Sequence, residues 1–168
     1  MPVTSAGLLL WRAPASAAAV APASGGPAEP EVFIAHMGGP FWARKQAGAW
    51  SIPKGEYADE EDPLAAARRE FAEEIGAPAP VVEYVDLGEF RYSSGKLVRV
   101  FAGAAPEFDV DEVRSNAFEL EWPPRSGRRQ SFPEVDEARW VPVSEARELL
   151  VAGQRPALDA LLRSAAAS

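Results

Sequence analysis

The sequence predicts a single α/β domain over residues 1–168, an α/β or α+β sandwich in which a mixed β-sheet is flanked by helices. The chain has 168 residues, the length of one domain. Segments typical of strands and segments typical of helices follow one another without the regular alternation of a parallel sheet. One helix in the first half of the chain has especially clear start and stop signals.

Two strands are predicted near the N-terminus, at residues 7–11 (GLLLW) and 32–37 (VFIAHM). Between them, residues 13–30 are almost all Ala, Pro, Ser and Gly, a composition that buries too little apolar surface to offset its ordering entropy. We therefore expect a mobile loop there. The apolar run at 6–11 is too short for a membrane span and lacks the preceding basic residues of a secretion signal, so we expect a cytoplasmic protein with no membrane partner.

A helix is predicted from Pro63 to Ile75. Asp62 is a good N-cap, and Pro63 suits the first helical position because its missing N–H costs nothing there. Gly76 ends the helix, since glycine readily adopts the left-handed conformation. An apolar seam along one side predicts docking on the sheet, with these members: Leu64, Ala67, Phe71 and Ile75.

The second half of the chain predicts a hairpin, further strands and two short helices. Residues 81–92 and 97–105 flank a turn and form the hairpin. Strands are expected at 117–122, where apolar and acidic residues alternate, and at 139–143. The segments 51–62 and 122–136 are interpreted as loops. The helices are expected at 145–152, capped by Ser144, and at 156–165, opened by Pro156.

Composition excludes several classes of chemistry. The absence of cysteine rules out disulfides, thiolate metal sites and a cysteine nucleophile. The single histidine, His36, disfavours multi-histidine metal sites and is interpreted as a packed or edge residue of its strand. A net charge of −8 disfavours a surface that coats nucleic acid. Catalysis in this chain would therefore depend on carboxylates.

The acidic residues gather in one segment. Residues 55–77 contain eight carboxylates and only two basic residues, both arginines. On the predicted helix, Glu70, Glu73 and Glu74 form a ridge of like charges near the end where the helix dipole disfavours them. A bound Mg²⁺ or Mn²⁺ would remove this conflict, because these ions prefer clustered carboxylate oxygens. The alternative interpretation is a solvated acidic face.

The pattern around this ridge favours the first interpretation. The segment GEYADEEDPLAAARREFAEEIGA, residues 55–77, fits G-x5-E-x7-R-E-U-x-E-E-x-G-U at every fixed position, where U is apolar. It resembles the signature of the Nudix hydrolases. The resemblance implies a Nudix-type α/β/α sandwich and hydrolysis of a diphosphate linkage by water, with Mg²⁺ or Mn²⁺ as cofactor.

The resemblance also implies roles for individual residues. Glu73 and Glu74 would be metal ligands, Glu70 a ligand or the base that deprotonates water, and Arg69 a structural residue that braces Glu73. A backbone carbonyl around Gly55 would reach the metal. Two further residues would assist, Glu61 beside the ligands and Lys54 on the polyphosphate chain.

Many family members take the base or a further ligand from outside this segment. Four carboxylates compete for that role here, of which the last two are slightly favoured: Glu119, Glu121, Glu134 and Asp136. Each also has an ordinary interpretation as a charge on a strand face or in a loop. The sequence alone does not choose among them.

The substrate class is the least determined point. WSIPKG, residues 50–55, resembles the corresponding segment of Nudix hydrolases that act on diadenosine polyphosphates and diphosphoinositol phosphates. Tyr92 lies near the position where the diadenosine-polyphosphate group often has a tyrosine. Further candidates are aromatic residues that would stack on a base and arginines that would meet phosphates, each with a packing or surface role as the alternative: Phe41, Trp42, Arg125, Arg128 and Arg129.

A small-molecule nucleotide is therefore the expected partner, with a dinucleoside polyphosphate favoured. The alternative substrate is a nucleoside triphosphate, and cleavage of nucleotide sugars or ADP-ribose is less favoured. Outside the enzyme class, the chain could be a nucleotide-sensing module, although such modules usually lose glutamates that Glu70, Glu73 and Glu74 retain here. A protein-interaction scaffold is the remaining alternative.

Overall fold

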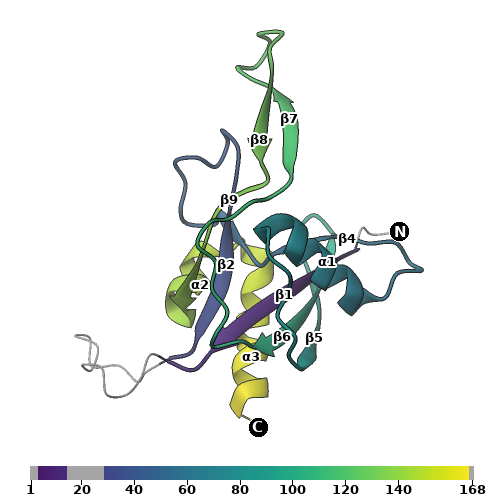
Figure 1. Cartoon of the computed structure of the whole chain (residues 1–168), viewed down its shortest axis with the longest axis vertical. Coiled ribbons are helices and arrows are strands. Elements are labelled where there is room, and N and C mark those ends of the chain that lie inside the picture. The colour runs from purple at the N-terminus through teal and green to yellow at the C-terminus, as the bar shows by residue number, and fades with distance from the viewer. Residues whose placement is uncertain (1–3, 15–28, 167–168) are drawn as a thin grey trace, which may run out of the picture.

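A mixed β-sheet with helices on both faces forms the body of the protein, and a separate hairpin projects from it (Figure 1). The computed structural model describes residues 4–14 and 29–166. Its strands are β1 (Thr4–Arg12), β2 (Glu31–Met37), β3 (Trp50–Ser51), β4 (Lys54–Glu56), β5 (Tyr84–Arg91), β6 (Leu97–Ala104), β7 (Ala117–Glu121), β8 (Arg129–Pro133) and β9 (Val135–Pro142). Its helices are α1 (Pro63–Ile75), α2 (Val143–Leu149), α3 (Arg155–Ala166) and the 3₁₀ turn η1 (Ala152–Gln154).

Strand β1 lies at the centre of the sheet. It pairs in parallel with β6 and antiparallel with β2 and β4. Strand β5 continues the sheet beyond β6, while β3 and β9 both pair with β2. Strands β7 and β8 pair only with each other, as a two-stranded sheet of their own. The sheet is therefore mixed, as the sequence predicts.

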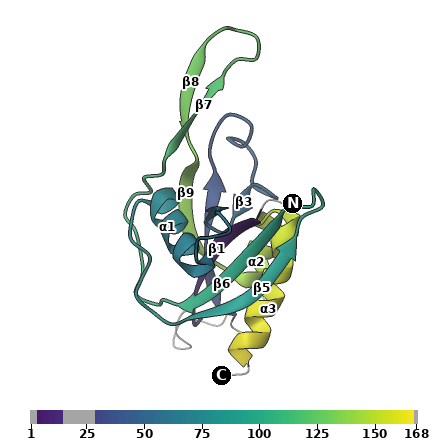
Figure 2. The ribbon, with the colours of Figure 1, turned by 90° about the vertical axis from the view of Figure 1, so that its right-hand side faces the viewer.

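The two faces of the sheet carry separate hydrophobic cores. Along β1, Leu8 and Leu10 pack with residues of α1, whereas Leu9 packs with residues of α2 and α3. Figure 2 shows α1 on one side of the sheet and α2 and α3 on the other. A central strand buried on both faces is apolar along its whole length instead of alternating, which explains the run at 7–11. The predicted α/β/α sandwich is confirmed.

Helix α1 has the predicted boundaries and caps. The carboxylate of Asp62 accepts a hydrogen bond from the Ala65 N–H at 2.9 Å. Gly76 adopts a left-handed conformation with φ of 85°. The predicted apolar seam faces the sheet, with Phe71 and Ile75 fully buried. This orientation places the acidic ridge beside β4.

Most of the other predicted strands and helices are present, but both segments interpreted as loops contain strands. Strands β3 and β4 have two and three residues, too few to show an alternating pattern. Strand β8 has the polar sequence RQSFP and forms through its pairing with β7. The hairpin of β5 and β6 is confirmed.

The predicted cap of α2 is wrong. Helix α2 begins at Val143, so Ser144 lies inside it. The carboxylate of Glu29 caps this end instead, accepting from the Ser144 N–H at 3.2 Å and from its hydroxyl at 2.6 Å. Glu29 belongs to the predicted mobile loop at 13–30, of which residues 15–28 lie outside the described part.

No helix among the described residues is long and apolar enough to cross a membrane.

The Asp62 cap is testable by substitution. We expect Asp62→Ala to lower the free energy of unfolding by about 1 kcal/mol, because the Ala65 N–H loses its acceptor. For a domain of this size that corresponds to a decrease in Tm of about 2–4 °C in thermal unfolding. Asp62→Ser is the matched control, since it removes the charge but keeps an acceptor. An unchanged Tm for the alanine variant would contradict the cap.

Candidate active site

The acidic ridge of α1 is joined to the sheet by one hydrogen bond. The Lys54 N–H, at the start of β4, donates to the Glu74 carboxylate at 2.9 Å. Strand β4 is held in turn by its pairing with β1, in which Lys54 lies opposite Gly7. The carboxylate at the end of the ridge is thus fixed relative to the central strand.

Gly55 makes room for a second carboxylate of the ridge. A Cβ atom at this position would collide with the carboxylate of Glu70. Glycine is therefore required here for the close approach of the backbone to an acidic side chain, and not for its backbone angles. The backbone at Gly55 and the Glu70 carboxylate therefore lie against each other.

Arg69 connects the acidic side chains to one another. It makes two hydrogen bonds to Glu61, both at 3.0 Å, and one to Glu70 at 2.8 Å. Its contact with Glu73 is longer, at 3.3 Å. The expected bracing of Glu73 is therefore present, but the bidentate pair with Glu61 is the main interaction. The hydrogen bonds that Arg69 donates to Glu61 raise the pKa of Arg69, which stays charged.

The electrostatic cost of the ridge appears in two pKa values. Burial raises the pKa of Glu74 from its ordinary 4.5 to about 7, against the opposing effect of the Lys54 N–H, and the negative charges of Glu134 and Glu70 add to the increase. Burial also raises the pKa of Glu70, although Arg69 opposes this shift. Both carboxylates are thus partly removed from water at an energetic cost, which a bound cation would offset.

Glu134 is the carboxylate from outside the ridge that the fold brings to this place. Its N–H donates to the carbonyl of Asn116, whose own N–H donates to the carbonyl of Glu73. Its carbonyl accepts from the N–H of Gly38, where any side chain would collide with Pro133. Backbone hydrogen bonds therefore fix the position of Glu134 relative to the ridge.

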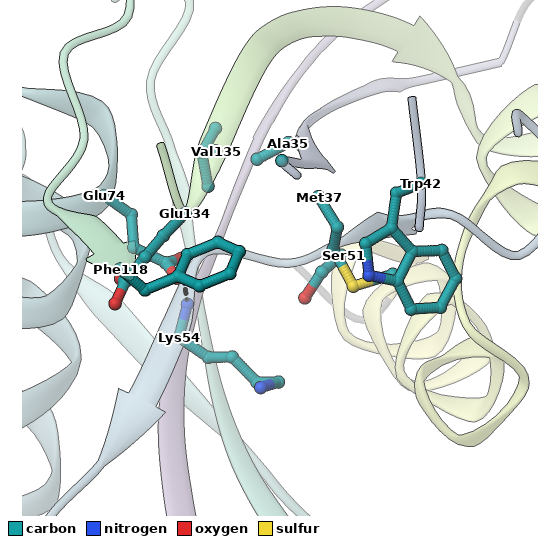
Figure 3. Close-up of a pocket in the computed structure, with 10 residues that line it drawn as sticks. Ala35, Met37, Trp42, Ser51, Lys54, Glu74, Phe118, Glu134 and Val135 are labelled. Carbon is teal, nitrogen blue, oxygen red and sulfur yellow. Dashed lines mark hydrogen bonds between the residues drawn. The ribbon is translucent and has the colours of Figure 1, made fainter. Parts of the chain in front are cut away.

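These groups line a cleft of about 260 Å³. Figure 3 shows Glu74, Glu134, Lys54 and Phe118 on one side of the cleft and Trp42 on the other. The floor comes from the ends of β2 and β3, and the lining residues not yet named are Ala35, Met37, Ser51 and Val135.

The other three candidate carboxylates lie elsewhere. Asp136 bonds the ring of His36 at 2.7 Å, and the other ring nitrogen of His36 bonds the carbonyl of Lys45. His36 is buried, as the sequence indicates. Glu119 pairs with Arg129 on the projecting hairpin, and Glu121 lies opposite Arg129 in the same hairpin. None of the three lines the cleft.

The predicted substrate-binding residues separate into two groups. Lys54 and Trp42 line the cleft. Tyr92 does not, because its hydroxyl accepts a hydrogen bond from the fully buried Gln154 at 2.7 Å. The remaining candidates lie on the exposed surface, Phe41 against Trp122 and three arginines around the hairpin turn: Arg125, Arg128 and Arg129.

Phe118 is a cleft residue that the sequence did not single out. Its ring lies against Gly39, where a Cβ atom would come within 2.8 Å of it. The alternation at 117–122 correctly places Phe118 and Leu120 on one face of β7, and both are half-buried, as is Trp122 just beyond the strand. A strand pattern shows which residues share a face, but not that the face adjoins a cleft formed by other segments.

The donor set fits a divalent cation. Three ridge carboxylates and the backbone around Gly55 supply oxygen ligands of the kind Mg²⁺ and Mn²⁺ prefer. The missing Cβ of Gly55 leaves the space that the Glu70 carboxylate occupies. Within the described ranges, no three acidic or histidine side chains already enclose a single point. Arg69, which holds Glu70 and Glu73, is the group with which a cation would compete.

Comparisons with known proteins identify the family and the fold. A family model described as the NUDIX domain matches residues 14–161. A search of curated proteins finds no match. Among solved structures, the chain is similar to a C. elegans Ap4A hydrolase in a binary complex, with a TM-score of 0.60 and 19% identity over 99% of each chain.

Two further solved structures share the fold. A mutT/nudix family protein from Listeria innocua has a TM-score of 0.60 and 16% identity, with 99% of this chain and 96% of that chain covered. The NUDIX domain of Shewanella oneidensis NrtR, complexed with ADP ribose, has a TM-score of 0.59 and 13% identity, with 98% and 89% covered.

The raised pKa of Glu74 predicts a pH-dependent stability of the metal-free protein. The folded state binds this proton up to about pH 7, whereas the unfolded state loses it near 4.5. The contribution of Glu74 to the free energy of unfolding therefore falls as the pH rises from about 4.5 to about 7. Glu74→Gln removes this titration while its amide oxygen still accepts from Lys54.

We expect the Glu74→Gln variant to have a higher Tm than the wild type at pH 8 in the presence of EDTA. The difference in Tm between the variant and the wild type should decrease towards pH 5, where Glu74 is protonated in the folded wild-type protein. Thermal unfolding across this pH range measures it. A variant less stable than the wild type at pH 8 would show that the carboxylate is well compensated and that the ridge is not under electrostatic strain.

Proposed function

The chain belongs to the Nudix hydrolase family, and we propose that it is a divalent-cation-dependent pyrophosphohydrolase of nucleoside polyphosphates, with a dinucleoside polyphosphate as the favoured substrate. The observation that carries the proposal is the convergence of Glu74, Glu134 and Lys54 on one cleft beside the acidic ridge. This arrangement combines ligands for a cation, a carboxylate outside the ridge and a positive charge for phosphate.

The residues proposed to hold the cation are Glu70, Glu73, Glu74 and a backbone carbonyl around Gly55. When bound, Mg²⁺ or Mn²⁺ neutralises charge that develops on the phosphoryl oxygens and acidifies the attacking water. Arg69 keeps its role as a brace, because its strongest contact is with Glu61 and not with a cleft residue. Lys54 holds the polyphosphate chain through its side-chain charge.

Glu134 is proposed as the general base. It is exposed, lines the cleft and lies near Glu70 and Glu74, whose pKa values its charge raises. In the reaction, the water oxygen forms a bond to phosphorus as the bridging P–O bond breaks. One proton of the water passes to the Glu134 carboxylate, and the leaving group departs as a phosphate. A positioned base of this kind contributes about 10²–10⁴-fold to the rate.

The aromatic residues of the cleft are proposed to hold a base. Phe118 and Trp42 lie on opposite sides of the opening, where each ring offers a face on which a base could stack (Figure 3). The ammonium group of Lys45 lies 5.5 Å from the centre of the Trp42 ring. Arg128, at the hairpin turn, lies farther out and is kept as a contact for the distal part of a long substrate.

Two features support a dinucleoside polyphosphate. The WSIPKG segment resembles that of diadenosine-polyphosphate hydrolases, and the fold is similar to that of the C. elegans Ap4A hydrolase. One observation favours a nucleoside triphosphate instead. The hydroxyl of Tyr92, whose position pointed to the first class, is bonded inside the protein. The triphosphate is therefore the second candidate, while the complete ridge argues against a sensing module that does not cleave.

A substrate panel with product identification tests the proposal. The panel contains dinucleoside polyphosphates, nucleoside triphosphates, ADP-ribose and diphosphoinositols, each with and without Mg²⁺. A dinucleoside polyphosphate releases two mononucleotides, whereas a nucleoside triphosphate releases a monophosphate and inorganic diphosphate. We expect hydrolysis only with the cation, and a decrease in kcat of at least about 100-fold for Glu74→Gln.

Glu60→Gln is the control for that loss. Glu60 is an exposed carboxylate of the same acidic segment, outside the cleft lining, so its substitution removes the same charge and should leave kcat unchanged. Near wild-type turnover by Glu74→Gln would show that the ridge does not hold the cation. Binding without hydrolysis of every member of the panel would identify a sensing module.

Base binding has a separate test. We expect Phe118→Ala to raise KM by about 5- to 100-fold with little change in kcat, because stacking contributes about 1–3 kcal/mol per base. Trp42→Ala should act in the same way. Leu120→Ala is the control, since Leu120 shares the face of Phe118 but does not line the cleft. Equal effects of Phe118→Ala and Leu120→Ala would mean that the ring only stabilises the hairpin.

A further inference from the structure

Gln154 is a buried polar side chain that the proposed reaction does not use. It lies in the turn η1 between α2 and α3, and it is fully buried. An amide group without hydrogen-bond partners would be costly in such a place. Among buried polar and charged residues of the described structure, it and His36 are the two that are found. Its surroundings therefore need an explanation.

The amide of Gln154 makes three hydrogen bonds to three different groups. Its oxygen accepts from the Ile52 N–H at 2.7 Å. Its nitrogen donates to the Ser51 hydroxyl at 2.9 Å and to the Tyr92 hydroxyl at 2.7 Å. Two of these contacts hold the short segment between β3 and β4, and the third ties the amide to the end of β5.

The segment held by Gln154 leads directly to the ridge. Ile52 is followed by Pro53, whose carbonyl accepts from the Leu8 N–H at 3.1 Å, and then by Lys54, whose N–H donates to Glu74. Ser51 also lines the cleft. Gln154 thus holds one end of a four-residue segment whose other end holds Glu74.

We propose that Gln154 is a positioning residue of the active site, which fixes the Ser51–Lys54 segment and through it the Glu74 carboxylate and the Gly55 backbone. The inference rests on the proposed function. It also gives Tyr92 a structural role. The Tyr92 hydroxyl accepts a hydrogen bond from the amide N–H of Gln154 that does not bond the segment. Groups that support metal ligands in this way typically change metal affinity or activity by about 10- to 100-fold when they are lost.

The test compares two substitutions within the same network. Gln154→Met keeps the length of the side chain but removes all three hydrogen bonds of the amide, two of which hold the segment. Tyr92→Phe removes only the contact on the opposite side. Two measurements are made on each full-length variant, the hydrogen exchange rate of the Lys54 amide by NMR, without metal, and kcat and KM with Mg²⁺ on the substrate that the panel identifies.

We expect Gln154→Met to accelerate exchange of the Lys54 amide and to lower kcat by about 10- to 100-fold, with KM little changed. Tyr92→Phe should leave the exchange rate of the Lys54 amide and kcat close to wild type, whatever its effect on Tm. Ser51→Ala, at a half-buried position, covers the case in which Gln154→Met does not fold. It should give a smaller decrease in kcat, with the same unchanged KM.

Equal Lys54 exchange in the Gln154→Met and Tyr92→Phe variants, or a decrease in kcat that follows Tm alike in both, would overturn the inference. If Gln154→Met does not fold and Ser51→Ala raises KM instead, Ser51 contacts the substrate and the inference also fails. A wild-type protein that hydrolyses nothing in the panel refutes the proposed function alone. The exchange rate of the Lys54 amide then still decides whether Gln154 holds the segment.

Discussion

The hydrogen bond from the Lys54 N–H to Glu74 is the contact on which the arrangement of the site depends. It joins the helix that carries the acidic ridge to a strand paired with the centre of the sheet. Both partners are constrained independently, Lys54 by the pairing of β4 with β1 and Glu74 by the docking of the α1 seam. The half-buried carboxylate of Glu74 is stabilised at this junction because a backbone donor meets it there.

Uncharged main-chain groups of the site hold its negatively charged side chains near one another. The Glu134 backbone is connected through Asn116 to the backbone of Glu73, so main-chain hydrogen bonds fix the position of Glu134 relative to the ridge. Two glycines, Gly38 and Gly55, permit approaches that a Cβ atom would block. The folding energy of the surrounding sheet and helix thus maintains a charge arrangement that is unfavourable by itself, as is common in functional sites.

The sequence predicted the parts of this protein that are specified locally. Helix α1, its caps at Asp62 and Gly76, and the ridge all follow from side-chain periodicity and backbone preference, and the structure agrees with each. The short strands β3 and β4 could not be predicted, because strands of two and three residues are defined by their partners and not by a pattern. The same holds for β8, whose polar residues form a strand only beside β7.

The residues of the site also fall into those that a local pattern predicts and those that depend on distant contacts. The ridge residues could be found from a contiguous motif, whereas the choice of Glu134 over Asp136 depends on which side chain His36 engages, a contact across 100 positions of the chain. Phe118 could not be recognised as a cleft residue because its partners come from other segments. The cap of α2 was missed for the same reason, since Glu29 reaches it from 115 positions away. The roles assigned to these residues remain proposals.

The projecting hairpin of β7 and β8 is attached to the body of the protein at its root. Its root is held by the bonds of Glu134 to Asn116 and Gly38, but beyond the root β7 and β8 pair only with each other. Its further contacts with the body include two ring contacts, Phe118 against Gly39 and Trp122 against Phe41. The part of the cleft formed by Phe118 therefore depends on the hairpin, whereas the part formed by Glu74 depends on the junction of α1 with β4.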